Sequence, residues 1–585
     1  MRRILIVITA TALALSGLAT NPTNAVMPTQ VMAGSSTAHF ETAVPATFGA
    51  GVQNVTPHGD LHSVSCSSAG NCVAVGSFLN TAGGTDAYTQ SQTGGTWANA
   101  TPATFGSGIQ PTTPDAHAEF FSVSCPLAGN CVAAGGFTNV DGGYEAFTQT
   151  QSGGNWGTAT PATFDLGVQS GTSYGFLDSV SCSSAGNCVA AGQFEDSTGA
   201  FEAFTQTKSE GIWANAIPAT FAPRVQSAKP SDRFNSVSCS SAGNCVAAGN
   251  FKNAAGYYEA FTQTQSGGSW GTATPATFGV GIQSSMPNDT FYSVSCPSAG
   301  KCVAVGEFKN TAGGTEAFTQ TQTGGTWATA TPAIFGSGIQ NATTNAWAGL
   351  LTVSCPSAGN CVAVGIFLNT AGDTEGFTQT QTGRIWANAT PTSFAPGIQS
   401  TTPETYARSV SCYSAGNCVV AGLFKNATGN YEAFTQTQSG GSWGTATPAT
   451  FGVGIQSTMP DAGFSSASCS SAGNCVAVGY FKNAAGNYEA FTQTRSAPKT
   501  YTLRAKHKYA AKTLAKQAGV AVVSKKAAVA IKVARASKKI CTKSGSKLKT
   551  LKAGRCVVTF TVQEPKPKTG KKPKARKSAR TFVVI

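Results

Sequence analysis

The chain of 585 residues holds only five histidines, and none of them recurs with the repeats described below. So little histidine argues against zinc sites that mix Cys with His. After residue 25 no stretch is long and apolar enough to span a membrane, and no helical periodicity appears before residue 500. No glycine-rich phosphate loop follows an apolar strand. These absences point away from metalloenzymes, nucleotide-binding folds and helical proteins.

Residues 1–25 have the parts of a secretory signal peptide. Residues 2–3 are both arginine, and residues 4–18 form an apolar run. Thr23 and Ala25 are small residues at positions −3 and −1 of a cleavage site. An uncleaved membrane anchor is the alternative, although the run is short for a spanning helix. We expect the mature protein to be secreted, and either extracellular or cell-wall-associated, where thiols oxidise.

Eighteen cysteines are an unusual number for a cytosolic protein and suit an exported one. Sixteen of them form eight pairs, each predicted to close a hairpin whose turn is the intervening "SSAGN" or a near relative. Zinc is the alternative, but no second pair lies near a first one in sequence. We predict no metal site and no cofactor. We predict a ninth disulfide, Cys541/Cys556, besides those within the eight pairs: Cys66/Cys72, Cys125/Cys131, Cys182/Cys188, Cys239/Cys245, Cys296/Cys302, Cys355/Cys361, Cys412/Cys418 and Cys469/Cys475.

The cysteine pairs mark a long internal repeat. Successive first cysteines lie 59, 57, 57, 57, 59, 57 and 57 residues apart, a period of the order of a four-stranded propeller blade. In the first unit, alternation and turn residues predict strands at "SVSC" (63–66), "CVAVGSF" (72–78), "DAYTQSQ" (86–92) and "TWANATPATF" (96–105). The expected fold class is all-β, with an eight-bladed β-propeller.

The two ends of the array predict a closed ring. The last unit stops after "EAFTQTRS" (489–496), before its fourth strand. The first unit is preceded by "HFETAVPATFGAGVQ" (39–53), in which Phe40 takes the place that Trp97 has in the next copy. A ring that borrows this strand has no open sheet edge, whereas a solenoid needs capping repeats instead. We therefore expect split-blade closure, with a β-solenoid as the alternative.

The repeat region resembles secreted propeller proteins of actinobacteria that carry "S-C-P-S-A-G-N-C" phrases, found here at 295–302 (with Lys301 for Asn) and 354–361. That resemblance implies a secreted or surface scaffold, usually without an assigned reaction. The "TGGTW" turns at 93–97 and 323–327 look like shortened Asp-box turns of sialidase-like propellers, but the motif's aspartate is absent. This second resemblance is to a hairpin and implies no active site.

The C-terminal part differs in charge from the body. Residues 498–585 contain 25 Lys and Arg and one acid, Glu564, which leaves 14 basic and 24 acidic residues before them. Segments such as "LKTLKAGRCVVTFTV" are similar to the final strands of bacterial Ig-like surface modules, and "AAKTLAKQAGV" (510–520) predicts a short helix. The expected organisation is therefore a signal peptide (1–25), an N-terminal linker (26–37), the propeller (38–496), a linker with a short helix (497–518) and a small basic Ig-like β domain (519–585).

A lysine-rich surface attracts polyanions in a salt-dependent way. We expect the tail to bind an anionic cell-wall polymer or another anionic surface, with a solvated basic face that has no specific ligand as the alternative. No sequence-reading motif is present and the tail has only four aromatic residues, so we expect no sequence-specific nucleic acid. The candidate polyanion-binding residues lie in one predicted loop: Lys566, Lys568, Lys571, Lys572, Lys574, Arg576 and Lys577.

The repeats contain no recognisable catalytic motif, and we assign no catalytic residue. One acid opens the third strand of every unit, and its eightfold repetition favours a structural role over a repeated ligand site or a catalytic pair. A repeated tryptophan is more readily inter-blade core than a sugar platform, whereas Trp347 stands apart and is expected to be exposed. The acids are Asp86, Glu145, Glu202, Glu259, Glu316, Glu375, Glu432 and Glu489; the tryptophans are Trp97, Trp156, Trp213, Trp270, Trp327, Trp386 and Trp443.

These features together favour a non-catalytic binding or adhesion scaffold, monomeric and tethered by its basic module, whose propeller binds an unknown glycan or protein. The alternative is a carbohydrate-active enzyme or lectin on the same scaffold. An enzyme needs a cluster of acids or histidines at the centre of the ring that does not repeat. A binding module can work from repeated positions.

Overall fold

The computed structural model describes residues 40–111, 116–169, 174–340, 346–471, 473–496, 500–517, 527–563, 565 and 575–584. The predicted signal peptide and N-terminal linker lie outside the described residues. The chain forms one compact unit over Ala38–Pro498 and a second that holds Lys499–Ile585. In the described part of the chain, no helix has the length and apolar character needed to cross a membrane.

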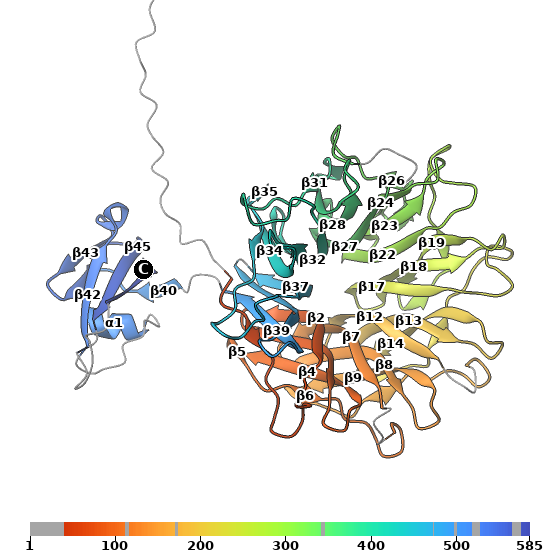
Figure 1. Cartoon of the computed structure of the whole chain (residues 1–585), viewed down its shortest axis with the longest axis horizontal. Helices are drawn as coiled ribbons and strands as arrows, with labels where there is room; N and C mark the ends of the chain where they lie inside the picture. Colours follow the sequence, from red (N-terminus) through yellow and green to blue (C-terminus); the bar gives the residue numbers. More distant parts are fainter. Residues whose placement is uncertain are drawn as a thin grey trace, which may run out of the picture. The chain divides into compact units, whose positions relative to one another are not determined.

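The first unit is an eight-bladed β-propeller, as the repeat predicts (Figure 1). Seven blades are five-stranded antiparallel sheets, and the eighth has four strands. In each complete blade three long strands lie side by side, and two short outer strands both pair with the third. The short pairs are β5 (Thr96–Trp97) and β6 (Thr101–Pro102), β10 (Asn155–Trp156) and β11 (Thr160–Pro161), β15 (Ile212–Trp213) and β16 (Ile217–Pro218), β20 (Ser269–Trp270) and β21 (Thr274–Pro275), β25 (Thr326–Trp327) and β26 (Thr331–Pro332), β30 (Ile385–Trp386) and β31 (Thr390–Pro391), and β35 (Ser442–Trp443) and β36 (Thr447–Pro448).

The long strands occupy the same three places in blades 1 to 8. The inner strands are β2 (Gly59–Ser68), β7 (Ala118–Leu127), β12 (Gly175–Ser184), β17 (Arg233–Ser241), β22 (Thr290–Ser298), β27 (Ala348–Ser357), β32 (Thr405–Ser414) and β37 (Ala462–Ser471). The second strands are β3 (Asn71–Leu79), β8 (Asn130–Thr138), β13 (Asn187–Glu195), β18 (Asn244–Lys252), β23 (Lys301–Lys309), β28 (Asn360–Leu368), β33 (Asn417–Lys425) and β38 (Asn474–Lys482). The third strands are β4 (Thr85–Thr93), β9 (Tyr144–Ser152), β14 (Phe201–Ser209), β19 (Tyr258–Ser266), β24 (Thr315–Thr323), β29 (Thr374–Thr382), β34 (Tyr431–Ser439) and β39 (Tyr488–Arg495).

The repeated "S-V-S-C" phrase lies at the centre of the ring, because the inner strands of neighbouring blades contact one another. The second serine of the phrase joins adjacent blades. Ser65 Oγ accepts a hydrogen bond from the Cys125 backbone N–H at 3.0 Å. The equivalent bond recurs at all eight junctions, with lengths of 2.9 to 3.1 Å. At the closing junction Ser468 Oγ accepts from Cys66 N–H, so the ring closes with the same bond that joins its other blades.

Split-blade closure is confirmed. The N-terminal strand β1 (Val44–Pro45) pairs with β39 of the eighth blade, with Val44 opposite Thr492 and Pro45 opposite Phe491. Phe40 forms a bridge to Arg495, as Trp97 pairs with Gln92 in the first blade. The segment before the first repeat thus completes the last one.

The nine predicted disulfides are all present, and no cysteine in the described part of the chain is free. In the propeller each bridge joins the inner strand of a blade to the second strand, with Cα atoms 4.0 to 4.2 Å apart. So many bridges suit an extracellular environment. The structure joins Cys66 to Cys72, Cys125 to Cys131, Cys182 to Cys188, Cys239 to Cys245, Cys296 to Cys302, Cys355 to Cys361, Cys412 to Cys418, Cys469 to Cys475 and Cys541 to Cys556.

The hairpin around each of these bridges is tighter than predicted. The sequence predicts a turn of five residues between the two cysteines, but both strands continue past them. In the first blade β2 ends at Ser68 and β3 begins at Asn71, so only two residues lie between the strands. The second cysteine of every blade therefore lies inside a strand instead of opening it: Cys72, Cys131, Cys188, Cys245, Cys302, Cys361, Cys418 and Cys475.

The prediction of one continuous fourth strand is wrong. In the first blade the segment 96–105 forms two short strands, and residues 98–100 between them only partly leave the ladder: Ala98 N–H still donates to the Ser91 carbonyl oxygen at 2.9 Å, while Ala100 N–H donates to Thr47. Gln90 explains the break, because its side-chain Nε2 donates to the carbonyl oxygen of Ala98 at 2.9 Å. Pro102, which has no N–H to give to the ladder, then ends the second piece.

The hydrophobic core lies between adjacent blades. One cluster joins Val73 and Val75 of the first blade to Phe120 and Phe137 of the second, and Trp156 packs against it. The other repeated tryptophans, and Phe40 in the eighth blade, hold the same place in the other clusters. The inter-blade interpretation of the tryptophans is therefore confirmed. Trp347 is half-buried and bridges to Thr315, so the expectation that it is exposed is wrong.

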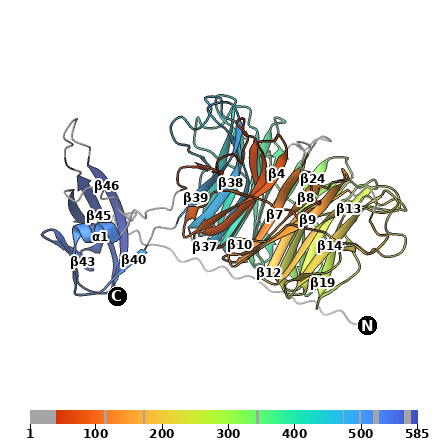
Figure 2. The same ribbon diagram turned by 90° about the horizontal axis from the view of Figure 1, so that it is seen from below.

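The C-terminal unit is a small β domain with two sheets, drawn in blue in Figure 2. One sheet has the order β40-β46-β45-β42 and the other β41-β44-β43. The disulfide between Cys541 and Cys556 joins strands of different sheets. The elements are β40 (Thr500–Leu503), β41 (Lys508–Ala510), α1 (Ala511–Gln517), β42 (Ala528–Val533), the short 3-10 helix η1 (Arg535–Ser537), β43 (Cys541–Ser544), β44 (Lys547–Thr550), β45 (Gly554–Gln563) and β46 (Arg576–Val584).

Two boundaries of this domain differ from the prediction. The segment 497–518, assigned to a linker, supplies β40, β41 and the predicted short helix, and Leu503 and Leu514 belong to the core of the domain. Arg576 and Lys577 belong to β46 rather than to the predicted basic loop. Both errors concern segments that the sequence reading gave to a linker or a loop and that pair instead with strands of the domain: β40 pairs with β46, and β46 pairs with β45.

Candidate functional site

The eight blades differ from one another at one end of the inner strand, as they also do in the loop before it and at one position of the second strand (Ser77 and its equivalents). The second half of the inner strand repeats as "S-V-S-C" with few changes, while its second and fourth positions, counted from Gly59 and its equivalents, vary widely in chemistry; β17 and β22 begin one residue later, at the second of these positions. We call these two sets of residues the variable rim. The second positions are Asp60, Glu119, Phe176, Arg233, Thr290, Gly349, Tyr406 and Gly463; the fourth positions are His62, Phe121, Asp178, Asn235, Tyr292, Leu351, Arg408 and Ser465.

Every inner strand has a β-bulge at the fourth position, one of the two positions that form the rim. In the first blade Leu61 lies opposite Gly76 and Ser63 lies opposite Val75, so His62 has no partner in the ladder. The same shift occurs in all eight blades. Bulges re-aim side chains and are frequent beside binding sites. A glycine stands opposite because a Cβ on Gly76 would lie 2.0 Å from the Asp60 carbonyl oxygen.

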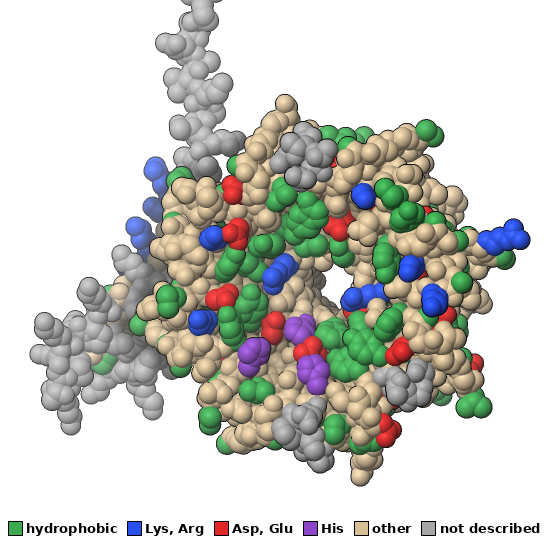
Figure 3. Space-filling model, turned by 45° about the vertical axis from the view of Figure 1, so that its right-hand side comes forward, with side chains coloured by type: hydrophobic (Ala, Val, Ile, Leu, Met, Phe, Trp, Pro, Cys, Tyr) green, Lys and Arg blue, Asp and Glu red, His purple; other side chains and the backbone are tan. Residues whose placement is uncertain are grey.

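The rim side chains contact one another from blade to blade. The His62 ring stacks near Phe121 with centroids 6.0 Å apart, and Phe121 meets Phe176 at 5.9 Å. The Arg233 guanidinium lies 5.1 Å from the centroid of Phe176 and donates two hydrogen bonds to the Asp178 carboxylate, at 2.5 and 2.8 Å. Figure 3 shows histidine, acidic and basic side chains gathered around the central opening on one face of the ring. From blade 1 to blade 4 the rim side chains therefore form a connected polar and aromatic surface.

A pocket of about 410 Å³ opens in the rim over blades 3 to 5. Arg233, Asn235, Tyr292 and Glu307 are among the residues that line it. Asn235 donates to the Phe291 carbonyl oxygen at 2.8 Å, and the Tyr292 hydroxyl donates to Glu307 Oε1 at 3.1 Å. The volume is that of a site for a small ligand. Its lining offers a guanidinium, carboxamides, a phenol and a carboxylate, which suit a polar ligand rich in hydroxyl groups.

The carboxyl groups near this pocket titrate at unusually high pH. Burial raises the pKa of Asp178 to about 6, although its hydrogen bonds from Arg233 oppose the rise. Burial likewise raises the pKa of Asp232 and of Asp289 to about 6. These two carboxylates also serve the fold, because they accept hydrogen bonds from the backbone N–H of Lys252 and Lys309, each at 2.9 Å.

We expect the propeller to be more stable at pH 5 than at pH 7.5. A carboxyl whose pKa is higher in the folded than in the unfolded chain binds its proton more tightly when folded, so stability falls as pH rises from about 4 to 6. The change is on the order of 2 kcal/mol for each buried carboxyl. Thermal melts across this range measure it. Asp289→Thr places there the residue found at the equivalent position 405, and it should flatten the profile; an unchanged slope would show that Asp289 does not titrate in this way.

A second cluster of polar side chains lies at the rim in blades 1, 2 and 7. His62 Nε2 lies 3.7 Å from Asp60 Oδ2, and His117 Nε2 lies 3.4 Å from Glu119 Oε1. Burial raises the pKa of Asp60, while the neighbouring His62 and Arg408 lower it. Within the described part of the chain, no group of three or more His, Cys, Asp or Glu side chains could hold a metal ion.

The acid that recurs at the start of the third strand is structural in most blades. Asn139 Nδ2 donates to Glu145 Oε1 at 2.8 Å, and the equivalent pair recurs in blades 4 to 8. Asn139 Oδ1 in turn accepts the N–H groups of Asp141 and Gly143 in the turn between the second and third strands. The acid thus orients the asparagine that holds this turn, as its repetition predicts.

The predicted disulfide cysteines lie away from the rim, near the opposite end of the inner strands, and serve the fold. The second cysteine of each pair is buried, with at most 4% of its surface exposed. The rim therefore contains none of the cysteines that the sequence singled out. The buried second cysteines are Cys72, Cys131, Cys188, Cys245, Cys302, Cys361, Cys418 and Cys475.

The predicted polyanion-binding residues fall largely outside the described residues. Lys566, Lys568, Lys571, Lys572 and Lys574 are not described, and the side chains of Arg576 and Lys577 are not described either. Their role stays a prediction. The variable rim is the site that sequence reasoning missed, although a signal was present: two positions of the inner strand vary between copies in which the "S-V-S-C" half of the same strand is nearly constant.

No protein-family model and no curated protein matches the sequence. Solved structures with a similar course of the chain include the sialidase of Trypanosoma rangeli, with 11% identity, 68% of this chain and 56% of that chain covered, and a TM-score of 0.32. The α-L-arabinanase of Penicillium chrysogenum has 11% identity, 57% and 94% covered, and a TM-score of 0.29. A polysaccharide lyase, an ulvan lyase, has 8% identity, 63% and 91% covered, and a TM-score of 0.36. The chain spans little more than half the length of the sialidase, and these likenesses concern the fold alone.

Proposed function

We propose that the chain is a secreted binding protein whose propeller recognises a polar, hydroxyl-rich ligand such as a glycan at the variable rim. One observation carries the proposal: residues that differ between otherwise similar repeats converge on one end of the ring and surround a pocket of about 410 Å³. A repeated scaffold needs no such variation for its own stability. The ion pair of Arg233 with Asp178 gives the pocket a fixed polar wall, and fixed polar groups are what confer specificity on a ligand site.

A glycan array probed with the propeller (residues 38–498) and with two arginine variants tests this proposal. Arg233→Ala removes a rim guanidinium and should reduce binding about tenfold or more, because the Asp178 carboxylate loses its partner as well. Arg224→Gly is the matched control: Arg224 is exposed, has a positive φ of 67°, and stands where most other blades have glycine. Equal loss in both variants, or none in either, would contradict a rim site.

The second candidate is a carbohydrate-active enzyme, and the pairing of Tyr292 with Glu307 favours it. Burial raises the pKa of Glu307, while the hydrogen bond from Tyr292 lowers it, so this carboxyl holds its proton to a higher pH than an ordinary glutamate. If the protein cleaves the ligand found by the array, Glu307→Gln should abolish release of reducing ends while binding persists. Retained binding without any turnover in the unmodified protein favours the binding role instead.

The basic charge of the C-terminal domain supports our proposal that this domain tethers the protein to an anionic cell-wall polymer. Its two-sheet construction fits an Ig-like module of a wall-associated protein. We expect the full chain to bind purified cell wall at about 0.15 M salt and to be released at about 1 M, where the screening length falls from about 8 Å to about 3 Å. Serine at positions 566, 568, 571, 572 and 574 removes five charges without altering β46. Binding that survives both high salt and these substitutions would contradict an electrostatic tether.

A further inference from the structure

A partly exposed group of aromatic side chains lies beside the rim pocket, in blades 2 and 3. We call Phe121, Tyr144, Tyr174 and Phe176 the aromatic platform. The ring centroid of Tyr144 lies 5.7 Å from that of Tyr174 and 6.5 Å from that of Phe176. Phe121 meets Phe176 at 5.9 Å, and Tyr174 is 42% exposed, so the platform reaches the surface. Figure 3 shows hydrophobic side chains beside the histidines at the central opening.

A glycine makes room for one ring of the platform. A Cβ on Gly136 would lie 2.4 Å from Tyr144 Cε1 and 2.7 Å from its hydroxyl oxygen, so the end of the Tyr144 side chain lies over the second strand of blade 2. The platform is therefore particular to this part of the ring and is no product of the repeat. The other seven blades have a side chain at the place of this glycine: Ser77, Gln193, Asn250, Glu307, Ile366, Leu423 and Tyr480.

The two tyrosine hydroxyls of the platform are not used by the fold. In blade 8 the equivalent of Tyr144 is Tyr488, whose hydroxyl donates to Asp461 at 2.6 Å. Within the described part of the chain, the hydroxyls of Tyr144 and Tyr174 have no hydrogen-bond partner, and the Tyr144 oxygen is not buried. A ligand that lies on the platform can therefore reach free hydroxyl groups as well as aromatic faces.

The charges near the platform favour a neutral ligand. Burial raises the pKa of Tyr144, and Glu119, Tyr174 and Asp178 add to the rise. An anionic group would face these two carboxylates. A neutral pyranose suits the platform, because its apolar C–H face can lie against an aromatic ring while the hydroxyl groups at its edge bond to the free phenols.

The platform and the rim pocket are adjacent. Arg233 lines the pocket, and its guanidinium lies 5.1 Å from the ring centroid of Phe176. Ser231, which also lines the pocket, bridges to Phe201, whose ring lies 5.7 Å from that of Tyr174. A ligand that fills both places is therefore longer than a single sugar residue.

We infer that the aromatic platform is a second subsite of the rim, and that the ligand is an oligosaccharide of at least two residues. One neutral pyranose stacks on the platform while the next residue lies in the pocket. This inference rests on the proposed function and adds to it the minimum length of the ligand and the neutral character of one of its residues.

The test compares monosaccharides with their disaccharides by ligand-observed NMR titration of the full chain. The probes are glucose with cellobiose and maltose, and N-acetylglucosamine with its β-1,4-linked disaccharide. We expect at least one disaccharide to bind about tenfold or more tightly than its monosaccharide, because only the disaccharide reaches both subsites.

Two independent variants remove the platform with residues that the fold already accepts. Tyr144→Thr with Tyr174→Ser copies the threonine and the serine found at the equivalent positions of blades 1 and 4. Gly136→Ser copies blade 1 and displaces the Tyr144 ring, since the nearest atoms that a new Cβ would meet belong to that side chain. Each variant should weaken disaccharide binding about tenfold, to the level of the monosaccharide, and leave the monosaccharide Kd unchanged.

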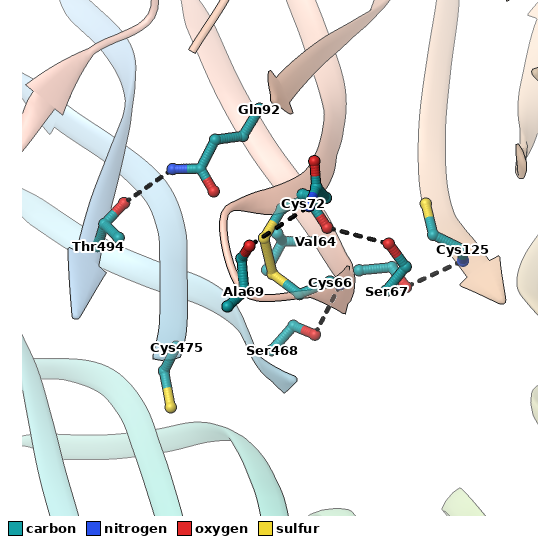
Figure 4. The surroundings of a disulfide bond; sticks show 12 residues. Val64, Cys66, Ser67, Ala69, Cys72, Gln92, Cys125, Ser468, Cys475 and Thr494 are labelled. Atoms are coloured by element: carbon teal, nitrogen blue, oxygen red, sulfur yellow. Dashed lines mark hydrogen bonds between the residues drawn. A yellow bond between two sulfur atoms is a disulfide. The ribbon is translucent and has the colours of Figure 1, made fainter. Parts of the chain in front are cut away.

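Tyr488→Thr is the matched control, because it makes the same change in blade 8, where the hydroxyl is bonded to Asp461. It should leave the binding of every probe unchanged. The bonds that join the blades lie at the other end of the inner strands, as Figure 4 shows for Ser468 Oγ and the backbone N–H of Cys66. The platform variants should therefore keep a closed ring and melt close to the unmodified protein.

Arg233→Ala should weaken monosaccharides and disaccharides alike, which tests the pocket of the proposed function separately from the platform. Disaccharides that bind no more tightly than monosaccharides, or platform variants that bind both as the unmodified protein does, would overturn the inference and leave the pocket standing. Absence of binding by every probe up to about 100 mM would overturn it as well, while the wider glycan array still decides the proposed function.

Discussion

Deleting residues 38–50 lowers the free energy of unfolding of the propeller by about 5 kcal/mol or more and produces dimers or aggregates. The strand β39 loses its partner β1, so its edge becomes free to pair with another molecule. The cores of two blades lose apolar side chains as well. Ala43 is only 4% exposed in the eighth blade, and the Phe48 ring packs 4.6 Å from that of Phe78 in the first.

Thermal melts and light scattering on the truncated and full-length proteins measure both effects. Phe40→Trp is the matched control, because it puts at the closing blade the residue that the other seven blades carry at the same place. That variant should melt close to the unmodified protein. A truncated propeller that melts at the same temperature and stays monomeric would mean that the N-terminal strand does not close the ring.

Gly249→Ala should destabilise the propeller by about 3 kcal/mol or more, the range seen when a buried site cannot relax. A Cβ at this position would lie 1.8 Å from the Arg233 carbonyl oxygen, and that atom belongs to the backbone of the neighbouring strand. Relief requires the two strands to move apart or the bulge that carries Asn235 to straighten, and either change also moves the rim. We therefore expect loss of ligand binding together with loss of stability.

Gly157→Ala is the control for this substitution. Its Cβ would meet nothing closer than the Thr150 carbonyl oxygen at 3.6 Å, and alanine stands at the equivalent position in other blades, as at Ala98. Chemical denaturation of the two variants gives the difference directly. If Gly249→Ala costs no more than Gly157→Ala, the close approach of the two strands is not what requires glycine.

The parts of the fold that repeat were predictable from the sequence. Each blade is a local unit, so the spacing of Cys66 and Cys72 was enough to predict a hairpin and its disulfide. The alignment of Phe40 with Trp97 predicted that the ring closes through the N-terminal strand, because the two residues occupy equivalent positions in different blades. Repetition supplies eight observations of one environment, and that removes much of the ambiguity of a single strand pattern.

The predictions that failed concern segments in which a side chain replaces a backbone hydrogen bond or in which the strand register shifts. Nothing in the local pattern of "TWANATPATF" indicates that Gln90, on another strand, would bond to Ala98 and split the segment. The bulge at His62 is likewise invisible to a period of two, since one unpaired residue shifts every later residue to the other face. The variable rim was missed for this reason: its residues meet only when eight bulged strands converge.

The central claim is that the repeats serve to hold a site that does not repeat. A crystal structure of the propeller with the ligand selected by the glycan array tests this claim most directly. We expect the ligand to lie in the rim pocket against Arg233, Tyr292 and Glu307, with its hydroxyl groups bonded to these side chains. A complex in which the ligand is bound elsewhere and this pocket holds only solvent would contradict it.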